Sequence, residues 1–474
     1  MKKALLVLLF PLFASAQTPS VSGIYLGGWN GESNFVSLSS DGQTIAVGGI
    51  DIDSEGVTFS RARIYSYNGN GWTQKGQTLE INDFSAGNLY PRSRVALSAD
   101  GDIMAMASPS HGANANAGLA RIYQFNGATW EQIGQDIIGA PTDYMGFDIA
   151  LSAEGKIFAI SASGTESDIN WGNVTVYQYN GSGWQQMGQK LIGEADEIGA
   201  IDFFQSSVSL SADGTIMCIG YPFGQDEWIM NVNGQVRVYQ YNGIIWQQVG
   251  ETIINEEGYN LGWDVSLSSN GNFLAAGRID YGYGIARVYG LTGGQWVQRG
   301  QDLIGDSFND EFGTSVAISA DGNILAVGAP DYGEGGRVKI FNFTGTQWQP
   351  AGESIDSNGT AFGSDLSMTP SGNYVAVSSP FSNFAEIYGL EDILDSNTFV
   401  KAGLSVYPNP TQKILNIELK DDIGLVNANI YDGSGKLMKT VETSVINVSD
   451  LSEGTYYIQV FTNKGKATKT FIKK

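Results

Sequence analysis

Residues 18–395 repeat one pattern of apolar and polar positions seven times. Each unit opens with a short alternating segment, continues through a turn dipeptide such as Asp41-Gly42, and then enters a segment of small apolar residues such as 45–48. Glycine takes the positive φ that a tight hairpin turn needs, so each unit predicts a β-hairpin. The turn glycines are Gly42, Gly101, Gly155, Gly214, Gly271, Gly322 and Gly372.

The second half of each of the first six units holds a bulky, mostly Tyr-containing segment, a short turn and a Trp-x-x-x-Gly segment, as in 63–76. Each unit therefore predicts four short antiparallel strands, which cannot bury both faces of their sheet alone. About 50 residues per four-stranded unit is typical of a β-propeller blade. We predict an all-β chain with a seven-bladed β-propeller over residues 17–395.

The seventh unit lacks the Trp-x-x-x-Gly segment, so its outer strand must come from elsewhere. Residues 21–28 precede the first unit and residues 399–403 follow the last, and either segment could complete the sheet. We favour the N-terminal segment because a strand from the other end of the chain seals the ring.

Both ends of the chain differ from the repeats. Residues 1–16 combine two lysines, an apolar run and Ala14-Ser15-Ala16, which predicts a secretory signal peptide. No later apolar run is long enough to span a membrane. After a linker at 396–403, residues 404–474 predict a small β-sandwich with nine lysines and seven acidic residues. Residues 18–403 hold 15 basic and 42 acidic residues, so the composition changes near residue 400.

The repeats resemble the FG-GAP repeats of integrin-α-type propellers. The sixth unit carries the likeness most clearly, with DEFGTSVAISADGNILAVGAP at 310–330 and GGRVKIF at 335–341. The resemblance implies a propeller fold with adhesion or ligand capture. Calcium-binding members carry Asp-x-Asp-x-Asp-Gly in the hairpin, whereas these hairpins carry only Ser-x-Asp-Gly, too few carboxylates for roughly six to eight oxygen ligands.

The C-terminal module is similar to the type A sorting domain of the type IX secretion system of Bacteroidota. The matching segments are VYPNPT at 406–411, LNIEL at 415–419, IYDGSGK at 430–436, LSEGTYY at 451–457 and FIKK at 471–474. The resemblance assigns the sorting motif to Tyr407, Pro408, Asn409 and Pro410. It implies the type IX secretion machinery as a partner, removal of the module near 395–405, and an extracellular or outer-membrane surface location.

The composition makes several kinds of partner and binding site improbable. A net charge of −23 disfavours nucleic acid and anionic membranes as partners. The single cysteine, Cys218, excludes an intrachain disulfide framework, and the single histidine removes most zinc sites. We expect no cofactor. Asp51, Asp53 and Glu55 begin like a calcium loop, but Ala62 stands where a bidentate Glu belongs, so a solvated acidic loop is favoured.

The connections between second and third strands, and those between units, are long and differ from unit to unit. In a propeller both classes emerge on one face. The candidate ligand contacts on this face are Trp171, Trp228, Tyr281 and Tyr332. Exposed aromatic rings beside Asp and Asn are typical of sugar and peptide sites, although such rings also cap the ends of blades.

These observations predict a secreted or cell-surface propeller that binds an extracellular glycan or protein without catalysis. One alternative is an extracellular polysaccharide hydrolase or lyase that uses Asp and Glu on the propeller face, although the sequence selects no carboxylate pair. The other is a non-catalytic structural component of the surface or of a biofilm.

Overall fold

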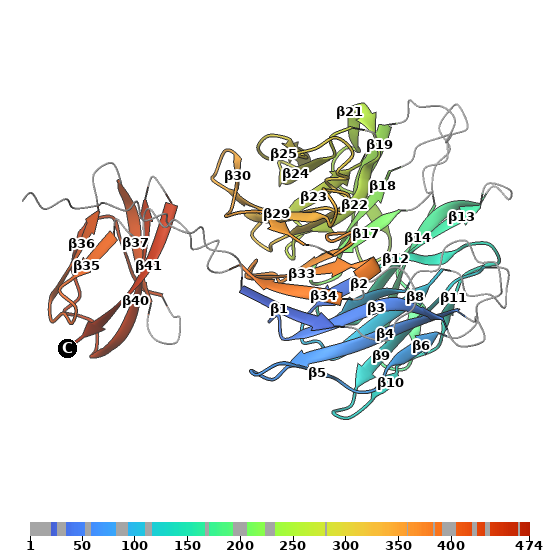
Figure 1. Cartoon of the computed structure of the whole chain (residues 1–474), viewed down its shortest axis with the longest axis horizontal. Coiled ribbons are helices and arrows are strands. Elements are labelled where there is room, and N and C mark those ends of the chain that lie inside the picture. The colour runs from blue at the N-terminus through green and yellow to red at the C-terminus, as the bar shows by residue number, and fades with distance from the viewer. Residues whose placement is uncertain are drawn as a thin grey trace, which may run out of the picture. The chain divides into compact units, whose positions relative to one another are not determined.

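The chain divides into two compact units, one formed by residues 20–391 and one that contains the chain from residue 392 to its end. The computed structural model describes residues 20–25, 35–52, 58–81, 93–109, 116–165, 170–192, 206–222, 233–279, 282–357, 359–382, 384–390, 404–419, 424–431, 437–462 and 465–474. Apart from one 3-10 turn at Pro380–Ser382, every regular element in these ranges is a β-strand (Figure 1). The all-β prediction is confirmed.

Six sheets of the larger unit follow the same path, in which four strands consecutive in the chain pair antiparallel. From the axis outwards, the first three sheets are β2 (Phe35–Leu38), β3 (Thr44–Ile52), β4 (Thr58–Tyr67) and β5 (Trp72–Gln74); β7 (Arg94–Leu97), β8 (Ile103–Ser108), β9 (Leu119–Phe125) and β10 (Trp130–Gln132); and β12 (Met145–Leu151), β13 (Ile157–Thr165), β14 (Asn170–Tyr179) and β15 (Trp184–Gln186). The next three sheets are β17 (Ser207–Leu210), β18 (Ile216–Tyr221), β19 (Asn233–Tyr241) and β20 (Trp246–Gln248); β22 (Leu261–Leu267), β23 (Phe273–Arg278), β24 (Ile285–Thr292) and β25 (Gln295–Gln298); and β27 (Ser315–Ile318), β28 (Ile324–Ala329), β29 (Arg337–Phe343) and β30 (Trp348–Pro350).

Each of these six sheets has a fifth short strand that the sequence pattern did not predict. It pairs with the third strand, beyond the point where the fourth strand stops, as Leu79 does opposite Ala62. The glycine of Trp-x-x-x-Gly lies between the two segments with a positive φ, 72° to 82° where it is Gly76, Gly300 or Gly352. The fifth strands are β6 (Leu79–Ile81), β11 (Ile137–Ile138), β16 (Leu191–Ile192), β21 (Ile253–Tyr259), β26 (Leu303–Ile304) and β31 (Ile355–Asp356).

The last sheet closes the ring. It contains β32 (Leu366–Met368), β33 (Tyr374–Ser379), β34 (Phe384–Gly389) and, as its outer strand, β1 (Ser20–Tyr25). Strand β1 pairs antiparallel with β34, and Figure 1 shows the two side by side. The innermost strands contact one another in the cycle β2, β7, β12, β17, β22, β27, β32 and back to β2. The predicted closure by the N-terminal segment is therefore confirmed, and the alternative segment 399–403 lies outside the described residues.

The tryptophans of the Trp-x-x-x-Gly segments join neighbouring sheets. The indole of Trp184 donates to the carbonyl oxygen of Ile133 in the preceding sheet at 2.9 Å. Gln135, also in the preceding sheet, bonds both backbone groups of Trp184, at 2.7 and 3.0 Å. The same indole bond forms at Trp130, Trp246, Trp296 and Trp348. A motif that recurs in the first six units therefore forms contacts between units.

Glycines near the ends of the second strands allow the sheets to approach closely. A Cβ on Gly277 would lie 1.9 Å from the carbonyl oxygen of Gly313 in the next sheet, and one on Gly328 would lie 2.0 Å from that of Gly363. Real Cβ atoms do not approach carbonyl oxygens so closely, so these positions need hydrogen as a side chain. The small residues that the sequence places near the axis are thus required by contact between sheets.

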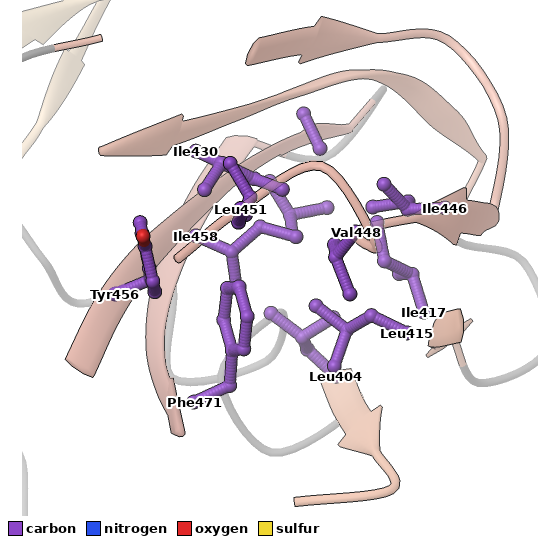
Figure 2. Packing of buried hydrophobic residues seen from close by; sticks show 12 residues of the cluster. Leu404, Leu415, Ile417, Ile430, Ile446, Val448, Leu451, Tyr456, Ile458 and Phe471 are labelled. Atoms are coloured by element: carbon purple, nitrogen blue, oxygen red, sulfur yellow. The ribbon is translucent and has the colours of Figure 1, made fainter. Parts of the chain in front are cut away.

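The C-terminal unit is a sandwich of two antiparallel sheets. One holds β35 (Leu404–Tyr407), β36 (Ile414–Leu419) and β39 (Val445–Asn447), and the other holds β37 (Leu425–Tyr431), β38 (Leu437–Val441), β40 (Gly454–Thr462) and β41 (Gly465–Lys473). Its core includes Leu415, Ile430, Ile458 and Phe471, each fully buried. Figure 2 shows these side chains gathered between the sheets. The unit has a hydrophobic core of its own.

The Gly277 contact gives a testable prediction. The variant Gly277→Ala should lower the free energy of unfolding by about 1–3 kcal/mol, because the added methyl group must push two sheets apart. The matched control is Gly290→Ala in the same sheet, where a Cβ would meet the Phe273 ring at an ordinary 3.5 Å. Urea unfolding of the full chain, followed by tryptophan fluorescence, measures both variants. Equal unfolding midpoints for the two would contradict the proposed close contact.

Candidate functional site

One equivalent residue recurs in each sheet, at the innermost strand. These residues stand directly before the Val-Ser-Leu-Ser-like segment of each unit, in or directly before the innermost strand. They are Phe35, Arg94, Asp148, Ser207, Asp264, Ser315 and Asp365. Phe35, Arg94 and the three aspartates line a cavity of about 290 Å³ that continues between the innermost strands. The sequence repeats the position but not the residue, so the charges of this site form no visible motif.

Arg94 lies at the centre of the axial site. Its Nε lies 3.4 Å from Oδ1 of Asp148, and its Nη1 lies 3.5 Å from Oδ1 of Asp365. Its guanidinium carbon lies 3.9 Å from the ring centroid of Phe35, within cation–π distance. One cation from the second sheet therefore interacts with side chains of the first, third and seventh sheets.

Each axial aspartate also binds the next sheet. Oδ2 of Asp148 accepts the backbone N–H of Val208 at 2.8 Å. In the same way Oδ2 of Asp264 accepts from Val316, and Oδ2 of Asp365 accepts from Val36, both at 2.7 Å. The last bond joins the seventh sheet to the first. One oxygen of each carboxylate thus stabilises the ring.

Burial controls the charge of two of these carboxyl groups. Burial raises the pKa of Asp264 to about 7, against the bond from Val316, and the charge of Asp148 adds to the rise. Burial likewise raises the pKa of Asp365 to about 7, which Arg94 and the bond from Val36 oppose. The axial site therefore holds carboxyl groups that are largely protonated in mild acid and largely ionised in mild base.

A second feature lies on the face where the sheet-to-sheet connections emerge, here called the loop face. Tyr283, between β23 and β24, and Phe308, between β26 and β27, have ring centroids 6.2 Å apart and planes at 88°. Their exposed fractions are 50% and 63%. The backbone N–H of Asn309 donates to the carbonyl of Gly282 at 2.8 Å, which joins the two loops. The loop face therefore presents a supported pair of exposed aromatic rings.

The structure describes two of the four predicted ligand contacts. Trp171 lies in strand β14 opposite Gly164, so this long connection between second and third strands is a hairpin whose strands pair as far as Thr165 and Asn170. Trp228 and Tyr281 lie outside the described residues. Tyr332 is half-buried, and the guanidinium carbon of Arg337 lies 3.6 Å from its ring centroid. Trp171 and Tyr332 belong to the third and sixth sheets, so they do not form one cluster.

The predicted acidic loop at Asp51 needs correction. Asp51 lies in β3, is 5% exposed and forms an ion pair with Arg61, so it is not part of a solvated loop. Asp53 and Glu55 lie outside the described residues. Within the described ranges, no group of three or more His, Cys, Asp or Glu side chains is arranged to hold a metal ion.

Two further sets of polar side chains belong to the scaffold of the larger unit. Two of the arginines that precede the Tyr-containing segments pair with acids of their own sheets. Arg121 binds Asp136 through two hydrogen bonds of 2.9 Å, and Arg287 binds Asp302 through two of 2.8 Å. Cys218 is buried in β18, and burial raises the pKa of its thiol. These groups support the scaffold and do not add a reactive site.

Comparison with known proteins identifies the C-terminal unit. Residues 405–474 match the family model of the secretion system C-terminal sorting domain. This match confirms the predicted sorting domain and indicates a secreted or cell-surface protein of a Bacteroidota-type bacterium. Among the described residues, no helix is long and apolar enough to cross a membrane. The predicted signal peptide at 1–16 lies outside the described residues.

Solved structures support the fold of the larger unit. Kuenenia stuttgartiensis hydrazine synthase is 13% identical, with a TM-score of 0.51 over 77% of this chain and 99% of that chain. The β-propeller domain of Myceliophteria thermophila Cps50 (Swd1) is 12% identical, with a TM-score of 0.50 over 78% and 99% of the two chains. The structural similarity supports the propeller fold, and at such low sequence identities it gives no evidence of a shared activity. No curated protein matches the sequence.

The raised pKa values at the axis predict how stability depends on pH. Because the folded state holds these protons up to about pH 7 and the unfolded state releases them near pH 4, the folded state binds more protons between these limits. The contribution of the two groups to stability therefore falls as pH rises from 4 through 7. The variant Asp264→Asn should lose part of this fall, since its amide does not ionise.

Thermal unfolding of the full chain at pH 5 and pH 8 tests this prediction. The difference between the two melting temperatures should be smaller in Asp264→Asn than in the wild type. Asp213→Asn is the control, because Ser211 and Thr215 bond the carboxylate of Asp213 and, against the effect of burial, lower its pKa. An unchanged difference in Asp264→Asn would contradict the assigned protonation.

Proposed function

We propose that this chain is an exported propeller that binds an extracellular glycan on its loop face, without catalysis. The sorting domain indicates secretion, and the larger unit has a propeller fold. The observation that carries the binding proposal is the exposed pair of Tyr283 and Phe308. The FG-GAP resemblance, with its implication of ligand capture, agrees with this proposal.

The aromatic pair has the properties of a sugar platform. Its two rings expose apolar surface to water, and a pyranose ring stacked on them would cover that surface. The loops beneath are held in place, since Gly305 donates to Gly284 at 2.9 Å and Asn309 donates to Gly282. A platform whose loops are already ordered loses little conformational entropy when it binds.

The sheet-to-sheet connection that carries Phe308 also carries a carboxylate. Asp306, two residues before Phe308, accepts from Arg337 at 2.8 Å and from Lys339 at 2.7 Å. Charged groups held in this way can bond the hydroxyls of a sugar without rearranging. Trp171, Trp228, Tyr281 and Tyr332 remain the sequence-based candidates for further contacts with the ligand.

Removal of either ring tests the platform. Tyr283→Ala and Phe308→Ala should each weaken retention of the full chain on immobilised polysaccharides by about tenfold, the effect of about 1.4 kcal/mol of lost stacking. Tyr67→Ala is the matched control, because Tyr67 is 37% exposed but is the last residue of β4, where it pairs with Trp72 of the outer strand β5. A panel of neutral and acidic polysaccharides identifies the bound class.

Two results would contradict the proposal. Wild-type protein that binds no polysaccharide in the panel would favour a protein ligand or a structural role at the cell surface. Unchanged retention in both ring variants would show that a bound polysaccharide occupies another part of the molecule.

A second candidate function is a polysaccharide hydrolase at the axis. The observation that favours it is the set of carboxyl groups around Arg94, among which Asp264 and Asp365 have pKa values of about 7. A neutral carboxyl group can donate a proton to a leaving sugar while an ionised neighbour acts as base or nucleophile. The backbone bonds of all three aspartates account for their presence without catalysis, so this candidate stands second.

Product release separates the two candidates. We expect the wild-type chain to release no reducing sugars from any polysaccharide that it retains, measured at pH 5 to 8. Release by the wild type that is lost in Asp365→Asn, with binding unchanged, would establish the hydrolase instead. The amide oxygen that this substitution introduces can still accept from Val36, so the variant retains the bond between the first and last sheets.

A further inference from the structure

The segment that carries the sorting motif holds the last three residues of the chain. Oδ1 of Asn409 accepts the backbone N–H of Ile472 at 2.9 Å. The backbone N–H of Thr411 donates to the carbonyl of Ile472 at 2.8 Å, and that of Lys474 donates to the carbonyl of Thr411 at 2.9 Å. Residues 61 to 63 positions apart in the sequence are thus joined by three hydrogen bonds.

These bonds extend a sheet of the sorting domain. Ile472 pairs with Thr455 of β40 on one side, and Thr411 forms a parallel bridge with Lys473 on the other. Thr411 is 1% exposed, and its hydroxyl donates to the carbonyl of Ile414 at 2.6 Å. The chain end therefore lies between two backbone segments, in extended form.

Both joined segments carry exposed side chains. Tyr407 and Ile472 are 47% and 43% exposed, although the neighbouring Phe471 is fully buried in the core (Figure 2). Lys474 is exposed as well. The amide of Asn416 donates to the carbonyl of Tyr407 at 3.1 Å, which holds the start of the motif against β36. Exposed apolar side chains and an exposed lysine therefore lie on the two segments that these bonds join.

We propose that the secretion machinery recognises residues 407–411 and 472–474 together, as one composite surface, with Asn409 and Thr411 as positioning residues. The match to the sorting domain runs through both segments, to the last residue of the chain. The exposed Tyr407 and Ile472 fit a partner with an apolar recess, and Lys474 fits acidic groups at the rim of that recess. The composite surface is independent of what the propeller binds.

Export of the full chain in a bacterium with a type IX secretion system tests this proposal. Asn409→Ala removes the acceptor for Ile472 and should lower the exported fraction at least fivefold. Asn409→Asp keeps an acceptor oxygen and should restore most of the export. Asn447→Ala is the matched control, because Asn447 is an exposed asparagine of the same domain whose side chain bonds Ser449.

Hydrogen exchange separates recognition from folding. In purified Asn409→Ala the amide of Ile472 should exchange faster, while the amides of Ile430 and Ile458 in the core stay protected. Normal export of a variant with a fast-exchanging Ile472 amide would overturn the proposal. An equal loss of export in Asn447→Ala would overturn it too.

Two further variants keep the test informative if Asn409→Ala unfolds the domain. Ile472→Thr retains the backbone bonds and removes only exposed apolar surface, so export should fall while the core stays protected. Deletion of Lys474 removes its bond to Thr411, and combining it with Asn409→Ala should lower export no further than the stronger single change. Normal export of Ile472→Thr, or fully additive losses, would contradict a single composite surface.

Discussion

Contact between neighbouring sheets is the interaction on which the propeller depends. No sheet of four or five strands buries both of its faces alone, so each is stable only while its two neighbours cover it. The contacts occur at three distances from the axis. Tryptophan and glutamine bond at the outside, glycine meets a backbone carbonyl farther in, and aspartate bonds a backbone N–H at the centre. An incomplete last sheet would expose a neighbour, which explains why β1 pairs with β34.

This requirement separates the residues that repeat from those that vary. Residues between sheets recur because every junction has the same geometry. The axial position is less constrained, since it needs only a side chain that fits the mouth of the axis, and it holds Phe35, Arg94 and aspartate in different sheets. The axial charge is therefore a property of the whole ring, and its burial raises the pKa of Asp264 and Asp365. The residues of the loop face vary from sheet to sheet because the geometry of the junctions does not constrain them either.

The sorting domain is stabilised by contacts within its own unit. Its core lies between two sheets of its own, and its motif and chain end are joined by hydrogen bonds to the side chain of Asn409 and the backbone of Thr411. The surfaces proposed for export and for ligand binding thus lie on different units of the chain. Such a division lets a propeller vary its loop face without altering the surface proposed for export.

The sequence by itself determined the repeat, the hairpin turns, the four main strands of the first six units and the sorting domain, because these depend on local patterns such as Asp41-Gly42 and on short motifs. It also indicated that β1 closes the ring. It did not reveal the fifth strands, which form only by pairing with the third strand of each sheet. Nor did it reveal the burial of Asp51, which depends on the ion pair with Arg61 of the neighbouring strand. Only the tertiary structure brought Arg94 to Asp148 and Asp365, and Asn409 to Ile472, because ring closure and strand pairing, not sequence spacing, place these residues together.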